Sequence, residues 1–208
     1  IGLLVFMSIL SMVGIEVGFH RYFSHCAFRT NTIIRVLLAI LGCMAGEGPP
    51  VYWAANHRRH HQYSDQPGDP HSPNLLGNGI RNRLWGLWHA HIGWILDLEL
   101  TNTVLYGKDL LRDPILTYIN KYYFWWLFIG LVIPAIIGGV LANTWTGFLS
   151  GFLWGGIIRL FLAQQITYFV NSLCHVFGSR PFRTSDRSTN IGWLAPLTFG
   201  GSWHNNHH

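Results

Sequence analysis

Charged side chains are scarce in this 208-residue chain. They make up 11% of its residues, whereas a soluble domain has about 25%. Half of the residues are apolar, so we expect much of the surface to face lipid rather than water. Cysteines are also few. Cys26, Cys43 and Cys174 form no C-x-x-C pair, which excludes a disulfide-rich secreted scaffold and favours a reducing compartment.

Long apolar runs are frequent in this chain, whereas charged residues and cysteines are few. Three stretches, near residues 1–19, 122–141 and 146–170, have the roughly 20 residues that a membrane-spanning helix needs. The last two are separated only by a short turn and should form a tight hairpin. Two shorter apolar segments, 33–45 and the tryptophan-rich 84–96, are predicted not to span, but to lie at the membrane interface or inside a protein cap. The sequence therefore predicts an all-α integral membrane bundle.

The distribution of basic residues predicts the orientation of the spans. Ten of the 14 Lys and Arg residues lie between Arg21 and Lys121, three follow the third span, and the hairpin turn has none. Basic residues stay on the cytoplasmic side during insertion, so residues 20–121 and 171–208 should form a cytoplasmic cap on one membrane domain. Arg159 lies inside the third predicted span, where we expect it to snorkel outward or to line the cap.

Histidine is unusually frequent and unusually clustered. The chain has 12 histidines. Residues three and four apart share one face of a helix, so two of the clusters can each present three imidazoles to one point. The four clusters are His20 and His25; His57, His60 and His61; His175 alone; and His204, His207 and His208. All four lie at span ends or outside the predicted spans.

Nine imidazoles exceed what one metal can use. A structural zinc ion takes four ligands, whereas two metals with four or five protein ligands each would use all nine. Iron is favoured for oxygen chemistry because zinc has no redox chemistry of its own, although zinc can substitute at imidazole sites. His71, His89 and His91 share no spacing with the clusters; we interpret them as supporting or interfacial residues.

The ordered motifs resemble those of the stearoyl-type (delta-9) acyl desaturase family. They are H-x4-H, H-x2-H-H, N-S-x-C-H and H-x2-H-H, and the segments 68–73 (GDPHSP) and 91–94 (HIGW) resemble further parts of that pattern. The resemblance implies oxygen-dependent desaturation of a saturated fatty acyl chain, with the nine histidines binding two iron ions and Asn171 holding a metal-bound water. It also implies that Trp53 and Thr167 bend the acyl chain in a tunnel. Glu47 stands near a position where the family usually has glutamine.

The same resemblance implies four spans in the complete protein. We therefore expect a chain truncated at both ends, with one span missing before Ile1. No cytochrome or flavin signature is present, so electrons should come from a separate carrier such as a cytochrome b5-like protein or a ferredoxin. The other expected partners are the lipid bilayer and the acyl substrate. We expect no nucleic-acid partner.

Three alternatives stay open. A di-iron hydroxylase or other oxygenase could use the same scaffold and would release an alcohol instead of an alkene. A histidine-rich metal transporter is disfavoured because its polar ligands should lie within the spans near the midplane. The stretch could also be an inactive fragment. Acyl chain length, double-bond position and the acyl carrier are not specified by the sequence.

Overall fold

A computed structural model describes residues 1–97 and 99–208 of the chain. These residues form two compact units. Unit 1 consists of Ile1–Ala54 and Gly107–Gln164, and unit 2 of Ala55–Tyr106 and Gln165–His208. Within the described ranges the regular elements are helices, and extended pairing is limited to the isolated bridges of Asn190 with Ser179 and with Trp203. The predicted all-α class is confirmed.

Unit 1 holds the first two long apolar helices and most of the third. Three helical stretches, Gly2–Ser24, Tyr123–Ala142 and Trp145–Leu173, are long and apolar enough to cross a membrane, which confirms the predicted number of spans. The first consists of α1 (Gly2–Met12) and the π-helix η1 (Val13–Ser24). The second is α8 (Tyr123–Ala142), and the third runs through α9 (Trp145–Ser150), the π-helix η3 (Gly151–Ile158) and α10 (Arg159–Leu173).

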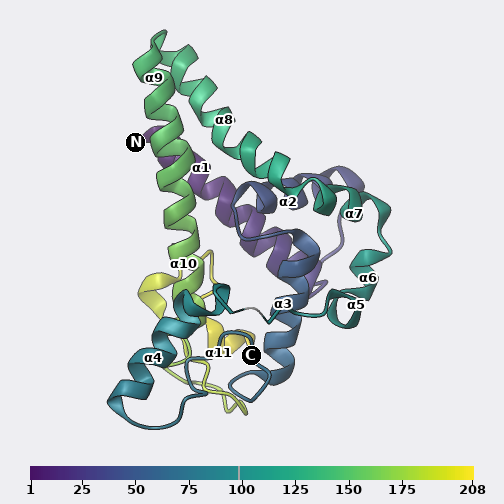
Figure 1. Cartoon of the computed structure of the whole chain (residues 1–208), viewed down its shortest axis with the longest axis vertical. Coiled ribbons are helices and arrows are strands. Elements are labelled where there is room, and N and C mark those ends of the chain that lie inside the picture. Colours follow the sequence, from purple (N-terminus) through teal and green to yellow (C-terminus); the bar gives the residue numbers. More distant parts are fainter. Residues whose placement is uncertain (98) are drawn as a thin grey trace. The chain divides into compact units, whose positions relative to one another are not determined.

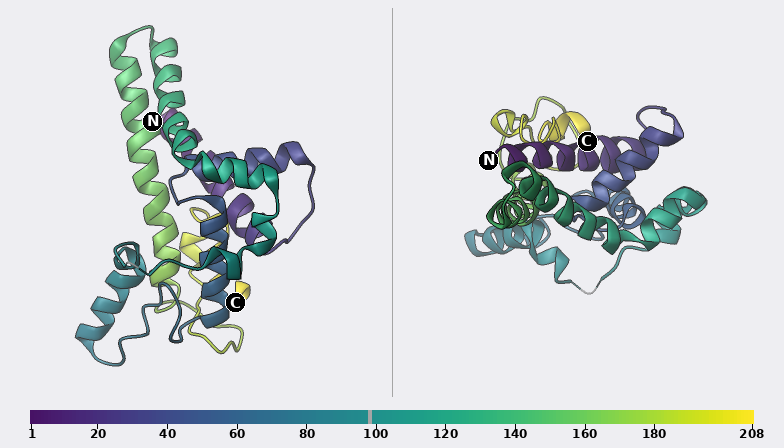
Figure 2. Two further views of the ribbon diagram at one scale, coloured as in Figure 1. Left: turned by 45° about the vertical axis from the view of Figure 1, so that its right-hand side comes forward. Right: turned by 90° about the horizontal axis from the view of Figure 1, so that it is seen from above.

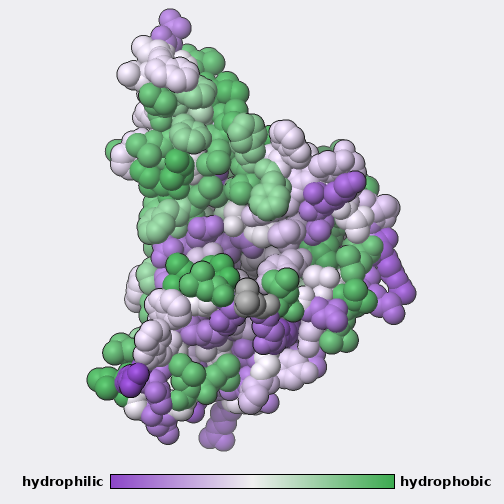
Figure 3. All heavy atoms as spheres, in the orientation of Figure 1, coloured by the Kyte–Doolittle hydropathy of each residue, from purple (hydrophilic) through white to green (hydrophobic). Residues whose placement is uncertain are grey.

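Helices α8 and α9 form the predicted hairpin (Figures 1 and 2). Asn143 adopts the left-handed conformation at the end of α8, and the Thr144 hydroxyl accepts a hydrogen bond from the Gly147 amide to begin α9. The third span packs closely against α8 where Gly151, the first residue of η3, has no side chain: a Cβ there would lie 2.1 Å from the Pro134 carbonyl oxygen. Large apolar side chains cover the outside of this hairpin, as the green surface in Figure 3 shows, and such a surface suits lipid.

Helix α2 (Thr32–Met44) has 13 residues and is too short to span, as predicted. Its first turn is capped by Asn31, whose side chain accepts from the Ile34 amide at 2.9 Å. An ion pair between Arg35 and Asp113, 2.6 Å apart, joins α2 to the start of α7 (Pro114–Lys121). Phe19, Phe23 and Cys43 belong to the buried apolar core of unit 1. Helix α6 (Lys108–Leu111) precedes α7.

Arg159 does not point outward, so the expectation that it snorkels is wrong. Its side chain is fully buried in unit 1. The guanidinium donates to the Met44 carbonyl oxygen at 2.6 Å, to the Gly130 carbonyl oxygen at 2.7 Å and to the Ser11 hydroxyl at 3.2 Å. Five fixed donors can satisfy acceptors from several helices at once, so Arg159 fastens the spans and α2 together from within.

Unit 2 carries the shorter helices and the loops between them. Helix α3 (Pro50–Tyr63) begins in unit 1 and ends in unit 2, as α10 does. The other helices of unit 2 are α4 (Ile80–His91), η2 (Gly93–Ile95), α5 (Thr103–Tyr106), η4 (Gly192–Leu194) and α11 (His204–His207). Unit 2 also has a small buried apolar core, formed by Val170, Cys174, Ile191 and Leu194.

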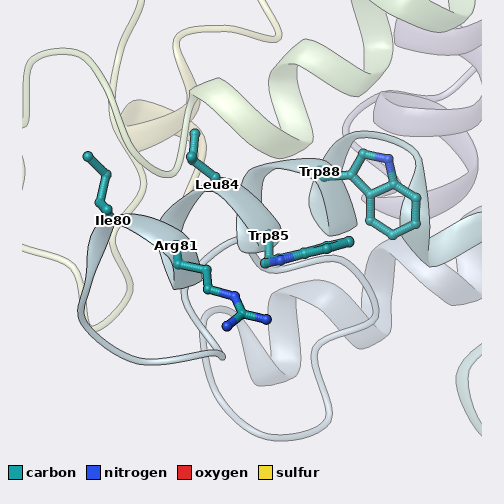
Figure 4. A pocket seen from close by; sticks show the side chains of 5 residues that line it. All are labelled: Ile80, Arg81, Leu84, Trp85 and Trp88. Atoms are coloured by element: carbon teal, nitrogen blue, oxygen red, sulfur yellow. The ribbon is translucent and has the colours of Figure 1, made fainter.

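Helix α4 has an exposed apolar face. On its inner face Gly86 packs against Pro73. A Cβ added to Gly86 would lie 2.0 Å from the Pro73 carbonyl oxygen. Its outer face forms a groove of about 610 Å³ lined by Ile80, Arg81, Leu84, Trp85 and Trp88 (Figure 4). Tryptophan and arginine beside exposed aliphatic side chains are typical of interfacial helices. The predicted interfacial location of this segment remains a prediction.

Candidate metal centre

The histidines of α3 lie on the part of that helix within unit 2. The spacing of His57, His60 and His61 predicts a shared face. His57 and His61 are one turn apart, and their Nε2 atoms lie 3.0 Å from each other. The His60 ring centroid is 5.7 Å from that of His61. The helix therefore presents two imidazoles to one point and the third beside them.

The last histidines of the chain meet this helix. His204 and His207 belong to the single turn of α11, and His208 follows it. The Nε2 atom of His207 lies 2.8 Å from that of His61, and the His208 ring stacks on the His61 ring with centroids 4.4 Å apart. Both trios therefore contribute to one histidine cluster within unit 2.

His175 completes one compact group of the cluster. The candidate ligand atoms of this group all lie within 4.8 Å of one another, a spacing that suits one metal ion; the group is His60, His175, His204 and His208. The Nε2 atoms of His60 and His208 are buried and have no hydrogen-bond partner within the described ranges. Buried polar nitrogens without partners are costly, whereas coordination of a metal would satisfy them. The donor set therefore fits a metal ion.

The protonation state of the group also suits a metal. Burial lowers the pKa of His60 and His204 well below the ordinary histidine value, and the neighbouring imidazoles lower it further. Burial lowers the pKa of His208 as well, although Asp186 opposes the shift. These rings are therefore neutral at physiological pH, and neutral imidazole is the form that binds metals.

His20 and His25 lie in unit 1, at the end of η1. Five residues separate them, which places them on different faces of an α-helix but one turn apart in a π-helix. The π-type geometry is present, because the His25 amide donates to the His20 carbonyl oxygen at 3.2 Å. The two ring centroids are 5.0 Å apart. Glu16 accepts a hydrogen bond from Nδ1 of His20 at 2.8 Å.

The other predicted site residues fall in both units. Asn171 lies in the last turn of α10, and Thr167 lies buried one turn before it; both belong to unit 2. Trp53 and Glu47 belong to unit 1. The Trp53 ring lies 5.8 Å from Phe19 and 6.3 Å from His20.

Glu47 carries a shielded carboxyl in the loop before α3. Its Oε1 atom is buried without a hydrogen-bond partner among the described residues. Burial raises the pKa of Glu47 to about 8; a hydrogen bond from Trp53 opposes the shift and the charge of Glu16 adds to it. The side chain is therefore mainly protonated near neutral pH.

The three unassigned histidines differ from one another. His71 stacks on His60 with centroids 4.5 Å apart, and burial lowers its pKa to about 3. His91 has both nitrogens engaged, with Ser172 at 3.1 Å and Gln165 at 3.0 Å. His89 lies 3.5 Å from Asp97. His71 therefore supports the cluster, whereas His91 and His89 serve local packing.

Three aspartates contact the cluster, and the sequence motifs do not predict these contacts. Asp65, Asp69 and Asp186 each lie within hydrogen-bond distance of a histidine ring. Asp69 lies in the GDPHSP segment, one of the stretches that resemble the desaturase pattern. The other two lie in loops whose spacing carries no signal.

Comparison with known proteins identifies the family of this chain. The family model described as fatty acid desaturase matches residues 1–208. The chain is 52% identical to the hex-5-enoyl-[acyl-carrier protein] acetylenase of Moorena producens, over 100% of this chain and 65% of that protein. It is 34% identical to the sn-1 stearoyl-lipid 9-desaturase of Anabaena variabilis, over 94% and 66% respectively. It is 35% identical to delta-9 acyl-lipid desaturase 1 of Arabidopsis thaliana, over 94% and 59%. The chain thus spans less than two thirds of the length of these relatives.

Proposed function

This chain belongs to the fatty acid desaturase family, and we propose that it forms the catalytic part of an oxygen-dependent fatty acyl desaturase. One observation carries the proposal: the buried group of His60, His175, His204 and His208, whose ligand atoms lie within 4.8 Å of one another. Four imidazoles in so small a space fit a metal better than they fit ordinary core packing.

The proposed metal content is two iron ions. The nine histidines of the four motifs would hold them, and Asn171 would supply a further polar group. Bound iron would supply the activation of dioxygen. Zinc is a possible substitute, because imidazole sites bind it more tightly than ferrous iron.

The proposed reaction removes two hydrogens from a saturated acyl chain and reduces dioxygen to water. One hydrogen leaves each of two neighbouring methylene carbons, and a carbon–carbon double bond forms between them. The two hydrogens, two protons and two electrons reduce dioxygen to two waters. The electrons come from a separate carrier, such as a cytochrome b5-like protein or a ferredoxin.

The protein's own side chains would position the acyl chain. We propose that Trp53, Thr167 and Glu47 line the channel that bends it, so that one pair of carbons faces the histidine cluster. A delta-9 position is the expected outcome, in keeping with the names of the relatives from Anabaena variabilis and Arabidopsis thaliana. The protonated Glu47 would present a hydrogen-bond donor without placing a charge beside the apolar substrate.

We place the enzyme in a membrane. Its three apolar helices and its family support an integral membrane protein. The basic residues of 20–121 and 171–208 support a cytoplasmic location for the histidine clusters.

A second candidate reaction is acetylenation. The relative with 52% identity is named as an acetylenase of a hex-5-enoyl chain on acyl-carrier protein, whereas the delta-9 relatives are 34% and 35% identical. Forming an alkyne from an alkene also removes one hydrogen from each of two neighbouring carbons, so the same site would serve. The substrate would then be an unsaturated, carrier-bound chain.

Product analysis distinguishes these candidates. The full-length protein is expressed in cells beside a His60→Ala, His175→Ala double variant, and total acyl chains are analysed by gas chromatography and mass spectrometry. A new alkene that is absent from the variant supports desaturation, and a new terminal alkyne supports acetylenation. A hydroxylated chain would reveal the oxygenase alternative. Identical acyl profiles for the two proteins, with iron present in the unsubstituted one, would reject the proposal.

A further inference from the structure

Three carboxylates of unit 2 each contact the Nδ1 atom of a predicted ligand. Asp69 lies 2.9 Å from Nδ1 of His60, and Asp65 lies 2.9 Å from Nδ1 of His175. Asp186 lies 3.0 Å from Nδ1 of His208. All three carboxylate side chains are almost fully buried, with exposed fractions of 0%, 5% and 7% respectively. The same contact therefore recurs at three of the four histidines in the compact group.

The contact determines which ring nitrogen carries the hydrogen. An ionised carboxylate only accepts hydrogen bonds, so each Nδ1 atom must donate. In a neutral ring the other nitrogen, Nε2, then has a free lone pair. The Nε2 atoms of His60 and His208 are buried without a hydrogen-bond partner among the described residues, and Nε2 of His175 lies 2.9 Å from Nε2 of His204. The lone pairs are thus directed inward, to the place where a metal would lie.

The carboxylates are themselves held in place. Asp65 accepts from the Ser72 hydroxyl at 2.6 Å, from the Asn74 amide at 2.8 Å and from the Arg187 backbone at 2.7 Å. Its backbone is left-handed, with φ +59°, a conformation that aspartate tolerates better than most residues. Asp65 therefore links the end of α3 to His175 and to the loop that contains Arg187.

Asp69 and Asp186 are fixed in the same manner. One oxygen of Asp69 accepts from the Asp65 amide at 2.8 Å, and the other accepts from the His71 amide at 3.1 Å. Asp186 accepts from the Ser188 amide and from the Thr184 hydroxyl, each at 2.8 Å. Each carboxylate thus accepts one hydrogen bond from its histidine, and further hydrogen bonds fix the orientation of the carboxylate. Such an arrangement resists rotation of the imidazole ring.

We propose that Asp65, Asp69 and Asp186 are positioning residues that hold His175, His60 and His208 with Nε2 toward one shared metal. The inference rests on the proposed function, because it assumes that these histidines bind a metal. Carboxylates in this position raise the basicity of the ligand, and their loss typically weakens metal binding by about 10- to 100-fold. They also explain how loops with no helical periodicity can present imidazoles in a defined direction.

The test is a metal titration of the full-length protein in detergent. Metal-free protein is titrated with Co²⁺, whose visible absorption reports both affinity and coordination geometry. Asp69→Asn and Asp186→Asn keep the shape of the side chain but remove its charge. We expect both to weaken the binding of one Co²⁺ by about 10-fold or more and to alter its absorption spectrum, while the helical content measured by circular dichroism stays that of the unsubstituted protein. Asp186→Glu should restore part of the affinity.

A matched control is available in the same unit. Asp97 also lies near a histidine, 3.5 Å from His89, but its side chain is 55% exposed and His89 is outside the cluster. Asp97→Asn should leave the Co²⁺ affinity unchanged. Unchanged affinity and spectrum in Asp69→Asn and Asp186→Asn would overturn the inference while leaving the metal site intact. If the unsubstituted protein bound no Co²⁺, the proposed function itself would fail, and the two failures are therefore distinguishable.

Discussion

The Nε2 atoms of His175 and His204 lie 2.9 Å apart, although 29 residues separate them in the chain. His175 follows the end of α10, and His204 begins α11. Two imidazoles whose Nε2 atoms are this close can bind one metal. Without a metal, the two rings would repel each other if both were protonated. Burial keeps the pKa of His204 low enough to avoid that charge.

Removing one of these rings should therefore remove metal. We expect His204→Ala to lower the metal content of the purified full-length protein by about one ion per chain, because the compact group loses one of its four nitrogens. Elemental analysis by mass spectrometry measures the change. His89→Ala is the control. Because His89 is outside the cluster, this variant should retain the full metal content. Equal loss in both variants would argue against a specific site.

The packing of the first span against α2 makes a sharp prediction about one glycine. A Cβ on Gly14 would lie 2.3 Å from the Gly42 backbone nitrogen and 2.4 Å from the Leu41 carbonyl carbon. Gly14→Ala should therefore force the helices apart and destabilise the protein by about 1–3 kcal/mol or more. The melting temperature in detergent measures this effect. Gly2→Ala is the control, because it makes the same substitution at a position where no atom lies within 4 Å of the added Cβ. This variant should have the melting temperature of the unsubstituted protein.

The buried Arg159 predicts a large loss of stability on truncation. Its guanidinium satisfies the carbonyl oxygens of Met44 and Gly130, which Arg159→Met would leave without that donor. Each buried acceptor left unsatisfied costs about 1–3 kcal/mol, so we expect a clear fall in melting temperature. Arg112→Met, at an exposed position, should have little effect. A stable Arg159→Met protein would show that water or lipid can satisfy these carbonyls.

Glu47 predicts how stability depends on pH. Burial raises its pKa from 4.5 to about 8, so the folded protein binds this proton more tightly than the unfolded chain. Its contribution to stability is therefore complete below pH 4.5 and is lost as the pH rises to about 8. Glu47→Gln should remove this loss and flatten the dependence of the melting temperature on pH across that window.

The control for Glu47 is a second glutamate with a different environment. Glu99 is paired with Arg59 at 2.5 Å, but its side chain is 76% exposed. Glu99→Gln should keep the slope of the unsubstituted protein. If Glu47→Gln and the unsubstituted protein lose stability equally between pH 4.5 and 8, the raised pKa is wrong.

Much of the fold and the cluster was predictable because both depend on periodicity. Apolar runs of sufficient length predicted the three spans, and the spacing of His57, His60 and His61 predicted neighbouring rings on α3. The resemblance of the ordered motifs to desaturases agrees with the family match over residues 1–208. These signals are local in the sequence, so they could be recognised without the structure.

The remaining features depend on contacts that spacing does not encode. His20 and His25 come together because η1 is a π-helix, whereas five residues place two side chains apart on an α-helix. Arg159 is buried because carbonyl oxygens from distant segments meet its guanidinium, and hydropathy alone does not reveal them. Asp65 and Asp186 reach the cluster from loops, where no repeat indicates which side chain points inward.

Anomalous diffraction at the iron absorption edge, from crystals of the full-length protein purified with iron, tests the central claim most directly. We expect two iron peaks per chain, one of them bounded by Nε2 atoms of His60, His175, His204 and His208, with the other held by the remaining predicted histidines. A single peak, or peaks distant from these imidazoles, would contradict the account.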